Sequence, residues 1–326
     1  MDAIRALRAR HSPTADSGAG VAILTVNYNG AAFIDRFIAS LSRLEAQDWR
    51  LIVVDCRSTD GSADRIGALM PGATLIRLPE NRGITGGHNR GIRAALACGV
   101  EHVLFLNPDT EADPRLLDEL LKFASARRLV APCVLLARQR TLMDDTVGDF
   151  DWRRGVWRGQ RYGRPRPAGF DPPRRAAMAS LTCLLVPAAA LRALGGVDGP
   201  WMDERYFMYY DDFDFVRRLR TLGYELIYAP QALVYHRKSA AGGGVDSPFK
   251  HYYATRNRLL LMRSASSVPF FCGFFLYFLS GRAVRAAQTL GRGRPGVAWA
   301  ILRGVVDFLA GRSGRTVLPG RAIGLR

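Results

Sequence analysis

The chain has 326 residues, of which 48% are hydrophobic and 23% charged, and its formal net charge is +17 at pH 7. This hydrophobic content can build a core and argues against a disordered chain. Five scattered cysteines with no C-x-x-C pair argue against a disulfide framework or thiolate zinc site, and favour a reducing compartment. Residues 1–20 carry arginines but no apolar stretch, so we expect no secretory signal there.

The positive charge is concentrated in two segments. One is a Gly/Pro-rich stretch, residues 149–175, which shows no helix or strand period. The other runs from His251 to the end, where the basic residues are all arginines and Asp307 is the only acid. Such an excess suits an anionic partner, which could be a nucleic acid, an acidic lipid surface or a phosphorylated substrate.

Apolar runs alternate with helical patterns in the first 125 residues. We expect strands at 21–26, 51–54, 74–78 and 103–106, and helices at 33–41, after 57–62, at 87–98 and after Asp113, with Asp113 as N-cap. Four strand–helix units in this length predict an α/β fold with a parallel, doubly wound sheet.

Polar side chains recur where these strands end, at Tyr28, Asp55, Asn81 and Asp109. Each alone is compatible with ordinary turn chemistry. Four in register along one sheet edge predict a nucleotide-binding cleft, because ligands of open α/β sheets bind outside the carboxyl ends of the strands.

The second half of the chain has weaker patterns. We expect strands at 129–136, 179–186, 224–228 and 232–235 and a short helix at 187–194. The last strand delivers His236, and a lone histidine at a strand end is more often structural than a ligand.

Residues 206–215, Y-F-M-Y-Y-D-D-F-D-F, place Asp211, Asp212 and Asp214 in the first turn of a helix behind a run of aromatics. Acids in a first turn complement the helix dipole and cap free amides. Capping needs only one acid, however. Crowded carboxylates in apolar surroundings have raised pKa values, which suits a general base.

Taken together, these residues resemble the family-2 inverting glycosyltransferases of GT-A fold, especially the bacterial rhamnosyltransferase-like branch. The resemblance covers about residues 21–257. Its motifs, in chain order, are T-V-N-Y-N-G (25–30), V-V-D-C-R-S-T-D-G-S (53–62), N-R-G-I-T-G-G-H-N-R-G-I (81–92), L-N-P-D-T (106–110), the 206–215 segment, V-Y-H (234–236) and R-N (256–257).

The resemblance implies a role for each matching position. Tyr28 would stack on the nucleobase of a nucleoside-diphosphate sugar and Asp55 would hydrogen-bond it. The same donor pocket would include Val26, Asn81, Gly83, Asn89, Asn107 and Asp109. Asp109 would also hold a divalent cation (Mg²⁺ or Mn²⁺) through the donor's diphosphate, with His236 as a further metal ligand.

Asp212 falls on the aspartate of the family's Glu-Asp pair and would be the catalytic base, with Asp211 in the glutamate position. The sequence departs from the family pattern at Asn107, which replaces an acid, and at Cys56, which replaces an asparagine. The carried-over chemistry is consistent: the acceptor hydroxyl needs a base, and a divalent cation neutralises a diphosphate leaving group.

We therefore expect a GT-A domain at 18–247, preceded by a flexible segment at 1–17 and followed by a basic, partly apolar helical extension at 248–326. It would move one sugar to a glycan or lipid-linked acceptor in cell-surface polysaccharide synthesis. One alternative is a sugar-nucleotidyltransferase, but the turn at 27–30 lacks the basic residue that such an enzyme would favour. The other is a basic nucleic-acid-binding protein, whose charge would line one recognition patch; we expect no nucleic-acid partner.

The extension contains an apolar run at 268–280 between arginines. As a helix this run spans roughly 20 Å, which is short of the ~30 Å hydrocarbon core of a bilayer, so we expect no transmembrane helix. One interpretation is a buried helix or hairpin. The one we prefer is an interfacial helix on an anionic membrane, which predicts a cytoplasmic protein held peripherally on the inner face of the cell membrane.

Overall fold

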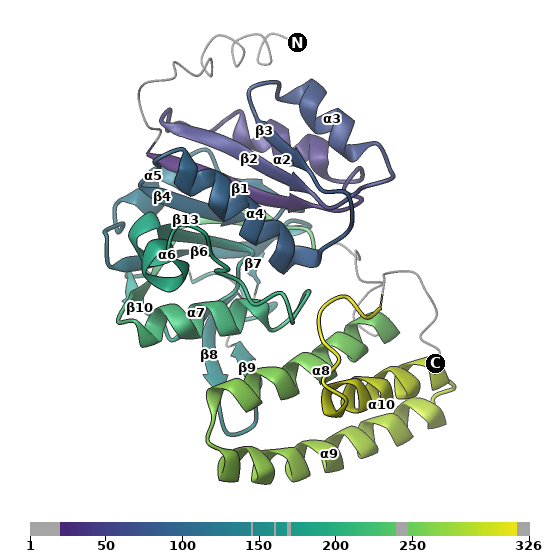
Figure 1. Ribbon diagram of the computed structural model, residues 1–326. Helices are drawn as coiled ribbons and strands as arrows, with labels where there is room; N and C mark the ends of the chain where they lie inside the picture. Colours follow the sequence, from purple (N-terminus) through teal and green to yellow (C-terminus); the bar gives the residue numbers. More distant parts are fainter. Residues whose placement is uncertain (1–19, 145, 160, 168–170, 239–246, 318–326) are drawn as a thin grey trace. The chain divides into compact units, whose positions relative to one another are not determined.

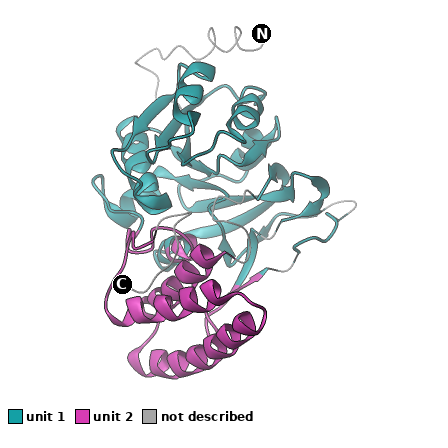
Figure 2. Cartoon of the chain, turned by 90° about the vertical axis from the view of Figure 1, so that its right-hand side faces the viewer, with its two compact units in different colours: residues 1–149, 159–202, 215–238 teal, residues 150–158, 203–214, 239–326 magenta. Residues whose placement is uncertain are grey.

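The computed structural model describes residues 20–144, 146–159, 161–167, 171–238 and 247–317 (Figure 1). The expected flexible segment 1–17 lies outside these residues. The chain divides into two compact units (Figure 2). Unit 1 comprises 1–149, 159–202 and 215–238, and unit 2 comprises 150–158, 203–214 and 239–326. Unit 2 therefore includes two short segments, 150–158 and 203–214, that lie within the sequence range expected for the GT-A domain.

Unit 1 begins with the expected alternation of strands and helices. Its strands β1 (Val21–Asn27), β2 (Trp49–Asp55), β3 (Thr74–Arg77) and β4 (His102–Leu106) are parallel and lie in the order β3-β2-β1-β4 (Figure 1). Helices α2 (Ile34–Leu41), α3 (Ser62–Leu69) and α4 (Gly83–Ala97) connect them. The parallel, doubly wound arrangement expected for this part of the chain is confirmed.

Side-chain alternation along β1 assigns its two faces. Ile23 belongs to the core cluster that α2 covers, while Leu24 and Val26 face α4. A Cβ at Gly91 would stand 2.0 Å from Leu24 Cδ1, and one at Gly87 only 2.5 Å from Val26 Cγ1. These glycines let α4 approach the sheet closely. The helix accordingly starts at Gly83 rather than at the expected residue 87, because its glycines serve packing and not a turn.

The other half of the sheet is mixed. Strands β6 (Arg128–Leu136), β12 (Cys183–Pro187) and β13 (Glu225–His236) extend it beyond β4, with β12 antiparallel to β4 and β6 parallel to β13. The two strands expected at 224–228 and 232–235 are one strand, whose pairing with β6 shifts register between Ala229 and Leu233. Helix α6 (Ala188–Gly195) matches the expected short helix.

The segment after β4 differs from expectation. A short strand β5 (Thr110–Ala112) pairs antiparallel with β13 before helix α5 (Leu116–Leu121) begins. The N-cap of α5 is Arg115, so the assignment of Asp113 as N-cap is wrong. Asp113 instead bends the chain toward the helix, because its carboxylate accepts a hydrogen bond from the Arg115 amide at 3.2 Å.

The arginine-rich stretch contains regular structure in its described residues. Strands β8 (Val147–Asp151), β9 (Val156–Gly159) and β11 (Met178–Ala179) form a small sheet in the order β11-β8-β9. Two further short strands, β7 (Gln139–Met143) and β10 (Arg174–Arg175), join the main sheet on β6 and β13. The strand expected at 179–186 is therefore divided between β11 and β12.

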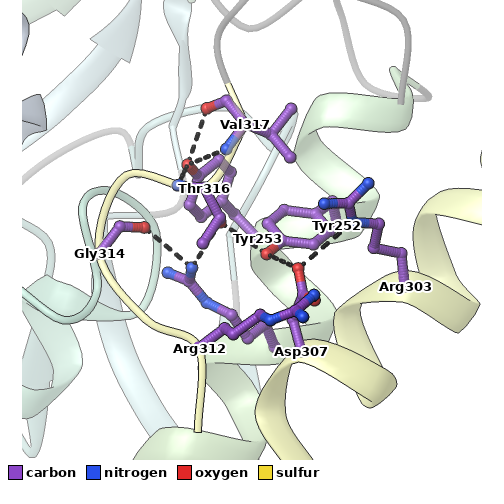
Figure 3. A network of polar contacts seen from close by, with 9 residues as sticks. Tyr252, Tyr253, Arg303, Asp307, Arg312, Gly314, Thr316 and Val317 are labelled. Atoms are coloured by element: carbon purple, nitrogen blue, oxygen red, sulfur yellow. Dashed lines mark hydrogen bonds and ion pairs between the residues drawn. The ribbon is translucent and has the colours of Figure 1, made fainter. Parts of the chain in front are cut away.

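Unit 2 is built on three helices, α8 (Pro248–Ala265), α9 (Val268–Gly291) and α10 (Pro295–Leu309). The residues after α10 return to α8 through the polar network of Figure 3. Tyr252 donates to Asp307 Oδ2 at 2.6 Å and Tyr253 to the Val317 carbonyl at 2.8 Å. Asp307, which is 1% exposed, is also paired with Arg303 and Arg312. The carboxylate of Asp307, the one acid of the extension, is thus paired with groups of the same unit.

Helix α9 is longer than expected and largely uncovered. It runs for 24 residues, where the apolar run alone suggested 13, because it continues through the arginines to Gly291. Its exposed positions recur at helical spacing and include Phe270, Leu276, Tyr277 and Val284. Among the described residues it is the one helix long and apolar enough to cross a membrane by length and composition, with a mean hydropathy of 1.2. The interpretation of this run as a buried helix is wrong.

Candidate active site

Asp55 lies at the carboxyl end of β2 and is 3% exposed. Its carboxylate accepts hydrogen bonds from Asn27 Nδ2 at 2.7 Å, from the Ser58 amide at 2.9 Å and from Ser58 Oγ at 2.6 Å. Because β1 and β2 are parallel and pair Asn27 with Asp55, the half-buried Tyr28 follows at the same edge of the sheet. The expected neighbourhood of Tyr28 and Asp55 is present, with Asp55 held in a fixed orientation.

Asn81 precedes α4 and Asn89 lies within its second turn. Asn81 Oδ1 accepts a hydrogen bond from the amide of Gly83, which has a φ of 71°. Asn89 donates to the Met202 carbonyl at 2.9 Å and accepts from the amides of Trp201 at 3.1 Å and Met202 at 2.8 Å. Its side chain thus holds the 201–202 segment in place, and its contact with a donor stays a prediction.

The turn after β4 presents Asp109. The Asn107 amide donates to the Thr182 carbonyl at 3.0 Å, and the Asn107 carbonyl accepts from the amide and hydroxyl of Thr110. This fixes the three-residue turn of which Asp109 is the last member. Val26, by contrast, is 7% exposed and packs under α4.

Asp109 and His236 meet at the pairing of β5 with β13, where Thr110 lies opposite His236. His236 Nε2 is 3.3 Å from Asp109 Oδ2, and His236 Nδ1 is 2.7 Å from Asp144 Oδ2. The other oxygen of Asp144 is 2.7 Å from Lys238 Nζ. Burial disfavours the imidazolium, but hydrogen bonds and negative charge from Asp109 and Asp144 outweigh it and raise the pKa of His236 to about 9. The structure therefore brings together the two residues expected as metal ligands.

This pair fits a divalent cation in its donor chemistry. A carboxylate oxygen and an imidazole nitrogen face each other at 3.3 Å. Asp144 on the far ring nitrogen fixes the orientation of the imidazole, as the partners of metal-bound histidines do. No group of three or more His, Cys, Asp or Glu side chains suited to a metal ion occurs in the described part of the chain. Donor phosphates and water would have to complete the coordination.

The three aspartates open α7 (Asp211–Thr221) without a basic partner in any contact described for Asp211 or Asp212. Burial raises the pKa of Asp212 to about 6. Burial, and then the charges of Asp212 and Asp214, raise the pKa of Asp211 well above its ordinary value. Asp212 Oδ1 accepts a hydrogen bond from the Phe213 amide at 2.9 Å. A carboxylate with this pKa is ionised at neutral pH and still basic enough to accept a proton.

The loop before α7 has an unusual backbone. Phe207, Tyr209 and Tyr210 have φ values of 64°, 64° and 67°, in the left-handed region that costs a bulky residue energy. Asn257 Nδ2 donates to three carbonyls of this loop, those of residues 206, 208 and 209, at 2.9, 2.7 and 2.9 Å. Arg256 donates to the carbonyls of residues 205 and 206. The R-N motif of the sequence thus holds the loop that leads to Asp212.

Two of these features were not found by reasoning from the sequence. Asp144 follows β7 and carries no motif; its only sequence signal is an acid at a strand end, and its pairing with His236 joins positions 92 residues apart. Asn27 was seen only as part of a turn, yet its side chain holds Asp55. Both depend on contacts between distant strands.

The comparisons with known proteins identify the family of the chain. The family described as Glycosyl transferase family 2 matches residues 22–173. The chain is 30% identical over 246 residues to an N-acetylglucosaminyl-diphospho-decaprenol L-rhamnosyltransferase of Mycobacterium tuberculosis, found in two strains, covering 68% of this chain and 77% of that protein. The chain therefore belongs to glycosyltransferase family 2, and the family decides for a glycosyltransferase over a nucleotidyltransferase or a nucleic-acid-binding protein.

A solved structure supports the fold. S. aureus TarS 1–349 in complex with UDP-GlcNAc aligns with a TM-score of 0.53 at 15% identity, over 89% of this chain and 80% of that one. The fold is thus a mixed α/β GT-A fold.

Proposed function

We propose that this protein is a metal-dependent, inverting glycosyltransferase that moves a single sugar, rhamnose as in its mycobacterial relative, from a nucleoside-diphosphate donor to a lipid-linked diphosphate acceptor. The observation that carries the proposal is Asp212, a half-buried carboxylate with a raised pKa at the family's base position. The relative's name supports the sugar and the acceptor class.

The reaction requires one displacement at the anomeric carbon. The acceptor oxygen forms the new bond to this carbon while the bond to the donor diphosphate breaks, and the nucleoside diphosphate leaves with the electron pair. Asp212 takes the hydroxyl proton. Because attack and departure occur on opposite faces, the anomeric configuration inverts.

The donor side would be supplied by unit 1. Tyr28 and Asp55 are the groups for the nucleobase, and Asp109 with His236 would hold the divalent cation. When bound, this cation neutralises charge on the diphosphate leaving group. His236 must release its proton before it can act as a ligand, and Asp144 would keep its ring oriented throughout.

We further propose that α9 lies in the interface of an anionic membrane, on the cytoplasmic side. The exposed positions of the helix include Leu276, Tyr277 and Val284 and no charged residue, while Arg263 and Arg292 are exposed beyond its two ends. At about 1.5 Å per residue its length is roughly 36 Å, enough to span a bilayer. The arginines at 282 and 285 in its second half favour an interfacial position over a spanning one.

The activity is tested by incubating the purified protein with a panel of nucleotide sugars, including nucleoside-diphosphate rhamnose donors with different bases, and a short-chain prenyl-diphosphate GlcNAc acceptor, with Mg²⁺, Mn²⁺ or EDTA. We expect a disaccharide product of inverted anomeric configuration by NMR, and none in EDTA. Retention of configuration, or full activity in EDTA, would contradict the proposal.

The membrane interface is tested by sedimentation with vesicles. We expect binding to vesicles that contain phosphatidylglycerol and not to pure phosphatidylcholine. A Leu276→Ser/Val284→Ser variant should bind less, while Val197→Ser, which changes an exposed apolar residue of unit 1, serves as the control. Equal binding of both variants to all vesicles would rule out α9 as the contact.

A further inference from the structure

Two arginines of unit 2 converge on one aromatic ring. Arg258 on α8 and Arg282 on α9 place their guanidinium carbons 4.9 and 5.3 Å from the centre of the Phe278 ring. The Nε atoms of both side chains are buried and have no hydrogen-bond partner among the described residues. A buried donor without a partner costs free energy, which makes this arrangement expensive unless a ligand completes it.

No ion pair compensates the charges of the two arginines in the described part of the protein, and the charge of Asp151 acts on Arg258 only at longer range. Arg258 donates to the Arg154 carbonyl, and neither guanidinium makes an ion pair with a carboxylate there. The arginines near Asp307 differ, since Arg303 and Arg312 are paired with its carboxylate. Burial lowers the pKa of both Arg258 and Arg282, and the charge of Arg258 lowers that of Arg282 further. Guanidinium groups nevertheless stay cationic at neutral pH.

The pair acts on a residue close in sequence to the predicted base, and an apolar cavity of the same unit lies one helical turn from Arg258. Tyr210, two residues before Asp212, feels the charges of both arginines. Met262 follows Arg258 by one helical turn and lines a cavity of about 330 Å³ together with Trp152 and Phe270. Phe270 is itself part of the exposed apolar face of α9. The cation pair therefore adjoins both the segment that leads to the predicted base and an apolar cavity.

We propose that Arg258 and Arg282 bind the diphosphate of a prenyl-linked acceptor, whose hydrocarbon chain enters the cavity beside Met262. The proposal rests on the function proposed above for the acceptor class. Planar guanidinium forks match phosphate oxygens, and two uncompensated cations match the charge of a diphosphate. Stacking on Phe278 alone does not explain the pair, because one arginine would satisfy the ring and the second adds like-charge repulsion.

The test measures binding of farnesyl diphosphate to the full chain by calorimetry in EDTA, which silences any metal-dependent diphosphate site in unit 1. We expect Arg282→Gln to weaken binding at least tenfold, as the loss of a charge-assisted hydrogen bond would. The affinity of Arg282→Lys for farnesyl diphosphate should lie between that of the wild type and that of Arg282→Gln. Arg292→Gln removes the same charge from an exposed turn and should bind like the wild type. Equal affinity of the 282 and 292 variants would overturn the proposal.

Arg258→Gln extends the test with a check of folding, since Arg258 also supports the Arg154 carbonyl. A variant that keeps the wild-type melting temperature and loses affinity supports the pair. A second arm uses phosphatidylglycerol vesicles. If Arg282→Gln loses vesicle binding and keeps farnesyl diphosphate affinity, the site serves lipid headgroups and the proposal is wrong.

Transfer to a short-chain prenyl-diphosphate GlcNAc acceptor separates the two proposals. If both proposals hold, Arg282→Gln should raise the KM of this acceptor about tenfold or more and leave the donor KM unchanged. The KM of a GlcNAc acceptor without diphosphate should be the same for Arg282→Gln and the wild type. If the wild type binds farnesyl diphosphate through Arg282 but transfers to no prenyl-diphosphate acceptor, the site stands and the proposed function fails.

Discussion

Unit 1 and unit 2 each contain a cluster of aspartates, and the two clusters have opposite surroundings. Asp144 is buried between His236 and Lys238, whose hydrogen bonds outweigh the effect of burial and lower its pKa. Asp211 is buried and Asp212 half-buried, neither beside a comparable cation, and the pKa of both carboxyl groups is raised. One side-chain type thus serves two purposes: the paired carboxylates are kept charged and suit a cation, and the unpaired ones retain affinity for a proton.

The largest effect is expected from the unpaired cluster. Asp212→Asn preserves size and hydrogen bonding but cannot accept a proton, so we expect kcat to fall about 10²–10⁴-fold. Donor binding, measured by calorimetry with Mn²⁺, should stay near the wild-type value, and Asp214→Asn should affect stability more than turnover. Near-full turnover of Asp212→Asn with an inactive Asp211→Asn would assign the base to Asp211.

Substitutions in the cluster around His236 should lower the affinity for the metal ion. His236→Ala should raise the Mn²⁺ concentration needed for half-maximal activity, and Asp144→Asn should do so by about 10–100-fold through loss of ring orientation. Paramagnetic titration of Mn²⁺ with nucleoside diphosphate measures the same affinity without turnover. If Asp109→Ala abolishes activity while the titration of His236→Ala is unchanged, His236 is structural.

Lowering the pH should reduce kcat through protonation of Asp212. Because Asp212 must be deprotonated to act as base, kcat should decline below about pH 6, about tenfold per pH unit once the group is mostly protonated. A pH profile at saturating substrates measures this decline. The residual activity of Asp212→Asn should lack this inflection, whereas the same inflection in the variant would mean that another group titrates.

The smallest effect concerns the loop that carries the base. Asn257→Ala removes three hydrogen bonds that hold residues with positive φ, and we expect a loss of about 1–3 kcal/mol in stability. Thermal unfolding measures the loss. Asn107→Ala serves as the control, because the hydrogen bonds described above for Asn107 come from its backbone. Equal melting temperatures for wild type and Asn257→Ala would show that the loop conformation does not depend on Asn257.

The sequence by itself determined the strands and helices of the first 125 residues and the placement of Asp55 and Asp109 at strand ends. These follow from local periodicity and from the rule that parallel strands end at one edge. It also determined the order of the motifs, and so the family. Where prediction failed locally, as with the start of α4, the reason was a contact of Gly87 and Gly91 with β1 that periodicity cannot show.

Only the tertiary structure decided which groups meet. The pairing of Asp144 with His236, the support of the 206–210 loop by Asn257 and the approach of Arg258 to Arg282 all join residues whose spacing follows no period. The sign of each carboxylate's pKa shift was equally out of reach, because it depends on whether a cation or an apolar wall lies within a few ångströms. Sequence specifies which residues can carry charge, and packing specifies what that charge encounters.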